Sequence, residues 1–140
     1  MIMWVAFHEE IYEYEFMFNI DTRLLLNGIG LWLAGTISLR LFGERLLHLH
    51  QSISTLILFA ASFAVMAWLV RRLCTGFHLK REQWPMGAIS LALPTLLLDP
   101  FSSAFFPAIF PNMAPEAAGV FGGWMLCCCA GAMAGAIFKR

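Results

Sequence analysis

Four long stretches of this sequence are nearly free of charged residues, and that feature constrains the fold more than any other. The stretches run over about Leu24–Phe42, Ile53–Val70, Pro85–Leu98 and Ala117–Phe138. A helix needs about 20 apolar residues to cross the hydrocarbon core of a bilayer, which is about 30 Å thick. The pattern therefore predicts an all-α fold, an integral membrane bundle of four transmembrane helices over residues 24–138.

The overall composition agrees with this prediction. Apolar residues make up 60% of the 140 residues and charged residues 13%, whereas a soluble domain has about 45–50% and 25%. The nine basic and nine acidic residues cancel, so the chain lacks the positive field that holds nucleic acid. We expect membrane lipid as its surroundings and no nucleic-acid partner.

The third stretch is shorter than the others. Pro85 suits the first turn of a helix, where its missing N–H has no partner to lose. Two alternatives fit the rest: either the helix extends at both ends and reaches residues 99–106, or Pro94 bends it. The segment Pro100–Glu116 holds four prolines in an uncharged, aromatic setting, which favours an interfacial loop or a re-entrant cap.

The first 23 residues differ from the rest and are expected to form an acidic N-terminal extension, residues 1–23. Five of the nine acidic residues lie there: Glu9, Glu10, Glu13, Glu15 and Asp21. A secretory signal needs a basic start and a cleavage site of small residues, so we expect an interfacial or loosely ordered extension instead. Met17 is an alternative start of the protein.

The basic residues predict how the helices are oriented, because lysine and arginine in short loops favour the cytoplasmic side. With four spans, one face collects seven of the nine: Arg23, Arg71, Arg72, Lys80, Arg81, Lys139 and Arg140. The other face holds Arg40 and Arg45. Both termini are therefore expected in the cytoplasm. Trp68 and Trp84 fall at the same interface, where amphipathic rings are enriched.

A stripe of small residues runs along the fourth stretch with a spacing of four. Its members are Gly119, Gly123, Cys127, Gly131 and Gly135. In lipid, helices associate through close packing of small residues, because apolar burial no longer drives them together. We expect the stripe to pack against another helix. That helix belongs either to this chain, where Gly30, Ala34 and Ser38 form a shorter stripe, or to a second copy or a membrane partner protein.

Arg40 is the costliest residue of the first stretch, since a charged side chain costs about 2.5–3.5 kcal/mol at the centre of a spanning helix and less near its ends. We therefore expect it to have a partner. Asp99, at the end of the third stretch, lies at the same membrane face, and Glu44 is the alternative, four residues further along the same helix. Arg40, Asp99 and Glu44 are the candidate polar site, either a structural ion pair or an ion or substrate site.

No metal or cofactor is expected. Cys127, Cys128 and Cys129 are consecutive, so on a helix they point about 100° apart and cannot close on one tetrahedral ion. The four histidines lie outside the expected spans, which argues against haem, although His48 and His50 could bind a metal weakly from outside. The chain has no phosphate-binding, metalloprotease, nucleophile-elbow or dinucleotide motif, and we expect it not to be an enzyme.

Several residues spread over the chain resemble a known family. They are the motif W-x3-T-x3-R-x-F-G, formed by Trp32, Thr36, Arg40, Phe42 and Gly43, and then Leu98-Asp99, Phe110-Pro111-Asn112 and Trp124. Over about Leu24–Phe138 the chain is similar to a family of small bacterial four-helix membrane proteins catalogued as a domain of unknown function. The resemblance implies a multi-pass protein of a bacterial inner membrane without an assigned activity. The acidic N-terminus and the Cys127–Cys129 run depart from the family's pattern.

Three functions fit these observations. The first is a non-enzymatic accessory or interaction bundle, which suits a chain with its polar residues at the ends of its spans. The second is a small transporter or permease-like protein with a polar site at the extracytoplasmic face, although proton coupling needs an ionisable group near the midplane. The third is a membrane enzyme with Asp99, Arg40, His48 and His50 at the outer face. We favour the first.

Overall fold

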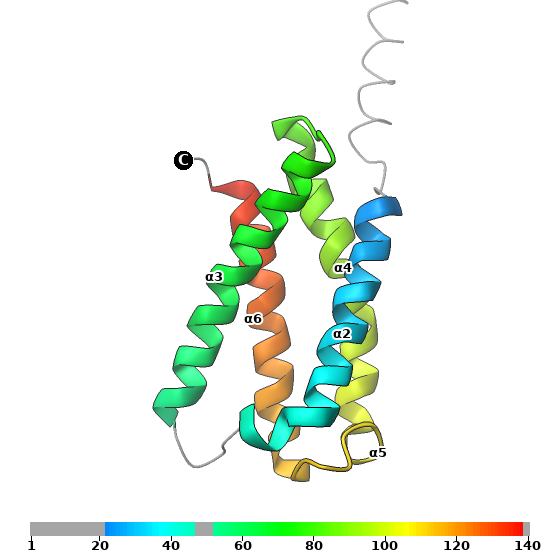
Figure 1. Ribbon diagram of the computed structural model, residues 1–140, viewed down its shortest axis with the longest axis vertical. Coiled ribbons are helices and arrows are strands. Elements are labelled where there is room, and N and C mark those ends of the chain that lie inside the picture. Colours follow the sequence, from blue (N-terminus) through cyan, green and yellow to red (C-terminus); the bar gives the residue numbers. More distant parts are fainter. Residues whose placement is uncertain (1–21, 47–51, 139–140) are drawn as a thin grey trace, which may run out of the picture.

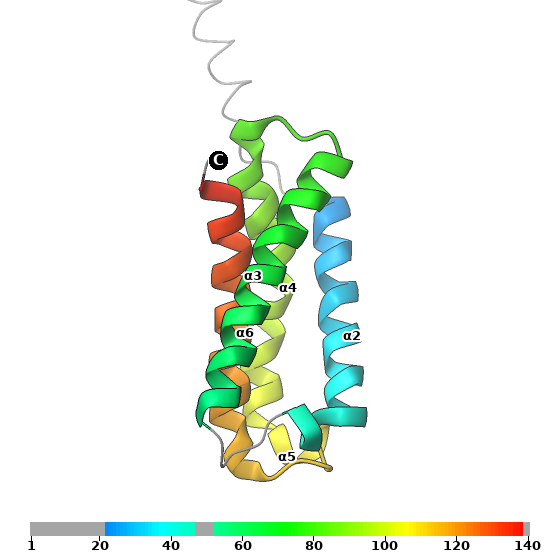
Figure 2. The same ribbon diagram turned by 60° about the vertical axis from the view of Figure 1, so that its left-hand side comes forward.

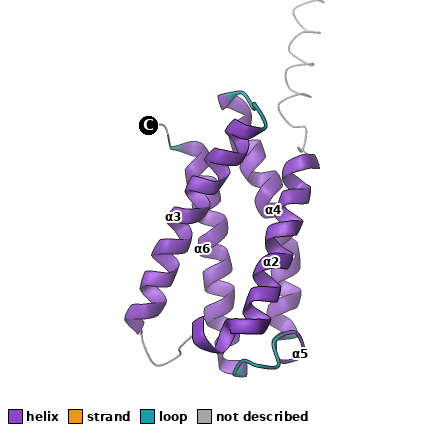
Figure 3. Cartoon of the chain, in the orientation of Figure 1, coloured by secondary structure: helices purple, strands orange, loops and turns teal. Residues whose placement is uncertain are grey.

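The computed structural model describes residues 22–46 and 52–138, and within them every regular element is helical. The four long helices are α2 (Thr22–Leu46), α3 (Ser52–Gly76), α4 (Trp84–Ala104) and α6 (Ala118–Ile137) (Figures 1 and 3). Three short elements connect them: η1 (Arg81–Gln83), α5 (Phe106–Ile109) and η2 (Pro115–Ala117). The all-α prediction is confirmed for these residues, and all four long helices are long and apolar enough to cross a membrane.

The long helices alternate in direction, so that α2 and α4 run one way and α3 and α6 the other (Figure 1). The start of α2 and the end of α6 consequently lie at the same end, which we call the upper end. In cross-section the helices form a row, in which α3 packs on α6, α6 on α4, and α4 on α2. Helices α2 and α3 therefore stand at opposite edges of the row (Figure 1), and Figure 2 shows α2 at the right-hand side of the bundle.

The outer faces of the edge helices are apolar and exposed. On α2 and α3 they include Leu26, Leu33, Ile37, Ile53, Leu56 and Ile57. A soluble protein rarely exposes so large an apolar surface. In a membrane the same surface contacts lipid, in agreement with the expected four-span protein.

Helix α4, the third expected span, is longer than the stretch Pro85–Leu98, as in the alternative in which the helix extends at both ends. It continues from Trp84 to Ala104 with Pro94 and Pro100 inside it, so the loop expected from Pro100 onward begins one turn later. The rest of that segment folds into α5 and η2 at the lower end. There Phe106, Phe110 and Phe121 pack with ring centroids 5.0–5.6 Å apart, and this aromatic cluster holds the connection under the bundle.

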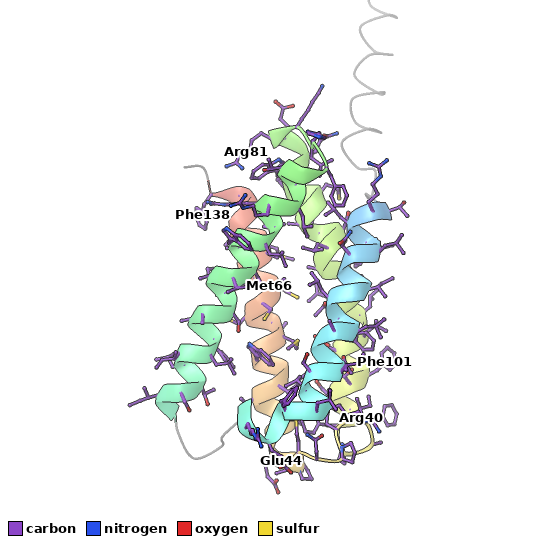
Figure 4. The ribbon with its side chains drawn as sticks, in the orientation of Figure 1. Arg40, Glu44, Met66, Arg81, Phe101 and Phe138 are labelled. Atoms are coloured by element: carbon purple, nitrogen blue, oxygen red, sulfur yellow. The ribbon has the colours of Figure 1, made fainter. Side chains whose placement is uncertain are left out.

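At the upper end, arginines bind the carbonyl groups that terminate α6. Arg71 donates from Nε to the carbonyl of Gly135 at 2.8 Å and from its terminal nitrogen to that of Phe138 at 2.9 Å. Arg81 stacks on the Trp84 ring at 3.8 Å (Figure 4). The last carbonyls of a helix have no partner within it and carry partial negative charge. Two of the basic residues used to predict the orientation thus also have a structural role.

Some expectations lie outside the described residues. These are nearly all of the acidic extension 1–23, of which residues 22 and 23 begin α2, together with His48, His50, Lys139 and Arg140.

Candidate functional site

The most unusual polar group in the described chain is the carboxylate of Asp99, on α4. Asp99 is only 8% exposed and is the only acidic residue of that helix. The indole Nε1 of Trp32 on α2 donates a hydrogen bond to its Oδ1 at 2.9 Å. The other oxygen, Oδ2, is buried and has no hydrogen-bond partner among the described residues. Asp99 therefore retains an unused acceptor inside the bundle.

Asp99 also lines a cavity of about 170 Å³ between α4 and α6. The cavity wall consists of Leu96, Asp99, Pro100 and Ser103 from α4, and Gly122, Met125, Leu126 and Cys129 from α6. Leu96 is 37% exposed, Leu126 is 63% exposed and Pro100 is exposed as well, so these three side chains form the rim of the cavity. All three belong to candidate membrane spans, and a bilayer would place this opening at the level of the lipid.

Two features of the local sequence lie at the wall of the cavity. Pro100 follows Asp99 directly and has no N–H, so it cannot donate to the carbonyl of Leu96 as a helical residue normally would. On the facing helix Gly122 has no side chain, and a Cβ built there would lie 3.7 Å from Oγ of Ser103. A larger residue at 122 would enter the space between α4 and α6.

The structure does not bring Arg40 and Asp99 together, and the expected ion pair between them is not formed. Arg40 is exposed near the lower end of α2 (Figure 4), eight residues, or about 12 Å along the helix, beyond Trp32. Because α2 and α4 run in parallel, residues level with Arg40 lie past Asp99. The neighbouring carbonyl of Leu39 accepts a hydrogen bond from Nδ2 of Asn112, in the connection that follows α5, at 3.2 Å.

Glu44 is also exposed at the lower end (Figure 4). Within the described ranges no ion pair joins it to Arg40. Of the three residues in the candidate polar site, only Asp99 is buried. The site that the structure supports is Asp99 with Trp32 and the cavity.

The small-residue stripe on α6 faces α3 of the same chain along much of its length. A Cβ on Gly131 would lie 2.9 Å from the Cα of Phe63, and one on Gly135 would lie 2.7 Å from the Cα of Ala67. Cys127 contacts the carbonyl of Phe59 at 3.5 Å through its Sγ.

The other two glycines of the stripe are less confined. Gly123 has ordinary contact with the Phe59 ring, at 3.5 Å. Gly119 meets nothing within 4 Å in the part of the chain that the structure describes. The shorter stripe on α2 is not the partner, since a Cβ on Gly30 also meets nothing there, and Gly28 instead packs on the carbonyl of Leu91 in α4.

The four cysteines are free thiols, and the described residues contain no group of three or more histidine, cysteine or acidic side chains placed to hold a metal ion. Cys127 contacts α3 and Cys129 lines the cavity, so these two thiols of the run face different neighbours.

Trp32 is the site residue that sequence reasoning missed as a partner of Asp99. One signal was available: its indole N–H lies in the middle of an apolar helix and needs an acceptor when buried. Asp99 is the only charged residue of α4. The Trp32–Asp99 contact could have been predicted by matching a buried hydrogen-bond donor to a buried acceptor, instead of matching opposite charges.

No curated protein and no solved structure matches the chain. Residues 46–140, which include Asp99 and every residue of the cavity, match a family of unknown function, DUF5367. The resemblance expected from the sequence began at Leu24, whereas this match begins at residue 46. Trp32 and nearly all of α2 therefore lie outside the match. With more than half of its length matched, the chain belongs to the family of unknown function DUF5367.

Proposed function

We propose that this chain is a small multi-pass membrane transport protein in which Asp99 exchanges a proton for a cation inside the bilayer. The observation that carries the proposal is the burial of Asp99 in a candidate spanning helix, with one oxygen bonded to Trp32 and the other without a partner among the described residues. Ionisable groups inside membrane spans commonly mark ion pathways and proton relays.

The physical argument concerns the charge of the carboxylate. One hydrogen bond from a neutral indole replaces only part of the hydration that an ionised carboxylate loses on burial. The described structure brings no arginine or lysine to it within ion-pair distance. The charge is best neutralised by a bound proton or a bound cation, and since one carboxylate holds only one of them at a time, the two compete. Such competition is the basis of exchange.

The geometry favours transport over the two other interpretations. An interaction bundle would present its small-residue stripe to a partner, but Gly131 and Gly135 already pack on α3. The interpretation as a membrane enzyme required Arg40 next to Asp99, and the two lie at different levels. Asp99, by contrast, is buried inside a candidate membrane span, five residues before the last residue of α4, and buried ionisable groups within spans commonly mark ion pathways.

The test uses the full chain in liposomes with a pH-sensitive dye trapped in the lumen. Sodium, potassium, tetramethylammonium or benzyltrimethylammonium chloride is added outside, and alkalinisation of the lumen reports protons leaving in exchange. We expect at least one of these cations to raise the lumenal pH. Asp99→Asn should reduce the rate of proton exchange to that of protein-free liposomes. An amide takes up no proton near neutral pH, and it carries no negative charge to hold a cation.

The matched control is Glu116→Gln, which removes an exposed carboxylate in η2 and should leave the rate unchanged. A wild-type protein that moves no protons with any of the four cations contradicts the proposal. Equal rates for Asp99→Asn and the wild type would also contradict it, because the exchange would then take place elsewhere.

The same proposal includes an orientation with both termini in the cytoplasm of a bacterial cell, in its inner membrane. It is supported by the basic residues of the upper end, Arg23, Arg71, Arg72, Lys80 and Arg81, against Arg40 and Arg45 at the lower end. A periplasm-dependent phosphatase fused after residue 140 should therefore be inactive, and one fused after residue 110 should be active. The reverse pattern would invert the orientation.

A further inference from the structure

We propose that the cation bound at Asp99 is an organic monocation of about the size of one aromatic ring with an ammonium group, and that it enters sideways from the lipid between α4 and α6. This inference rests on the proposed function and names its substrate class. Three properties of the cavity support it: its volume, its lining and the position of its opening.

The volume sets the size of the ligand. A cavity of about 150 Å³ with an apolar lining holds one benzene molecule, whereas sites for drug-sized ligands measure about 300–1,000 Å³. At about 170 Å³, the cavity next to Asp99 accommodates one ring or an equivalent set of alkyl groups. Multi-ring cations are too large for it without rearrangement.

The lining favours an organic cation over a metal ion. An inorganic cation such as sodium or calcium gives up water only where several oxygen atoms replace it. Here the side-chain oxygens are the Asp99 carboxylate and the Ser103 hydroxyl, and the remaining lining side chains are aliphatic or carry sulfur. An ammonium with apolar substituents needs only the carboxylate for its charge, and its substituents gain by burial against Leu96 and Met125.

The opening determines the route of entry. Leu96, Pro100 and Leu126 are the exposed residues of the lining and form the rim. All three lie inside candidate membrane spans, so an amphipathic cation already dissolved in the bilayer reaches the cavity without passing through the aqueous ends of the bundle. A strongly hydrated ion has no such route.

The binding test is calorimetric titration of the purified full chain in detergent with benzyltrimethylammonium. The uncharged isostere neopentylbenzene, in which carbon replaces nitrogen, is the matched ligand. We expect saturable binding of the cation with release of about one proton, measured by repeating the titration in buffers of different ionisation enthalpy. Asp99→Asn should weaken binding about tenfold or more, since it removes the only charge opposite the ammonium, and should leave the weak binding of neopentylbenzene unchanged.

The route is tested at the rim. Leu126→Trp, at a position 63% exposed, should close the opening and slow benzyltrimethylammonium-driven proton exchange in liposomes about tenfold or more. Leu97→Trp is its control, because Leu97 is similarly exposed at 59% on α4 but lies outside the cavity lining. As a second variant with little risk to folding, Leu126→Ala should widen the opening and shift the preference toward benzyltriethylammonium.

The outcomes separate this inference from the proposed function. Sodium-driven proton exchange through Asp99 without organic-cation binding overturns the inference and leaves the function standing. Organic-cation binding that survives Asp99→Asn overturns the inference, and an unchanged rate of proton exchange in the same variant overturns the proposed function. An unchanged rate of organic-cation exchange in Leu126→Trp, with unchanged preference in Leu126→Ala, overturns lateral entry. Equal binding of the cation and neopentylbenzene identifies the cavity as a site for neutral apolar molecules and contradicts the proposal.

Discussion

Gly131→Leu and Gly135→Leu are each expected to destabilise the folded protein by about 3 kcal/mol or more, whereas Gly119→Leu should be nearly neutral. The reason is the distance between backbones. At Gly131 and Gly135 even a single Cβ overlaps the main chain of α3, at Phe63 and Ala67. Overpacking typically costs about 1–3 kcal/mol when side chains can adjust, and a helix backbone adjusts less than a side chain does.

The measurement is thermal or denaturant unfolding in detergent, with folded yield as a second readout. Gly119 provides the control within the same stripe, because in the described chain a Cβ there meets nothing within 4 Å. Equal stability of Gly131→Leu and Gly119→Leu would contradict the close approach of the α6 backbone to the α3 backbone at Gly131.

The stripe shows how far sequence reasoning extends. A spacing of four residues defines one face of a helix whatever lies opposite, so the close-packing face could be predicted from glycine positions alone. Its partner could not, because the choice among α2, α3 and a second copy depends on the order of helices in the row. That order is determined by many weak contacts, including that of Gly28 with Leu91, which has no distinctive pattern in the sequence.

The expected ion pair between Arg40 and Asp99 was wrong for a different reason. The pairing of Arg40 with Asp99 assumed that the third span ends near Leu98, with Asp99 at the membrane surface, although an extension to residues 99–106 was one of the two alternatives. In the structure α4 continues to Ala104, which moves Asp99 about 8 Å into the helix and level with Trp32. Pro94 and Pro100 made this extension difficult to predict. Proline is strongly unfavourable inside the helices of soluble proteins, whereas membrane-spanning helices tolerate it.

The Trp32–Asp99 hydrogen bond is expected to show a coupling energy of about 1–2 kcal/mol in a double-mutant cycle, near the upper end of the range for polar contacts between membrane helices. Trp32→Phe keeps an aromatic ring but removes the donor, which leaves Asp99 Oδ1 buried and unpaired. Asp99→Leu leaves the indole N–H of Trp32 unpaired in turn. Each single substitution should cost about 1–3 kcal/mol, and the double variant should cost less than the sum, because no unpaired group remains.

Two further variants decide what kind of interaction this is. Asp99→Asn retains an acceptor oxygen without the charge, so it should keep the coupling to Trp32 and most of the stability while losing exchange. Arg40→Leu combined with Asp99→Leu should give additive losses, because the two side chains lie at different levels of the bundle. Coupling to Arg40 instead of Trp32 would restore the ion pair expected from the sequence and remove the basis for the exchange site. Coupling to Trp32 alone would leave Asp99 with a neutral partner and a free acceptor, the state from which it can take up either a proton or a cation.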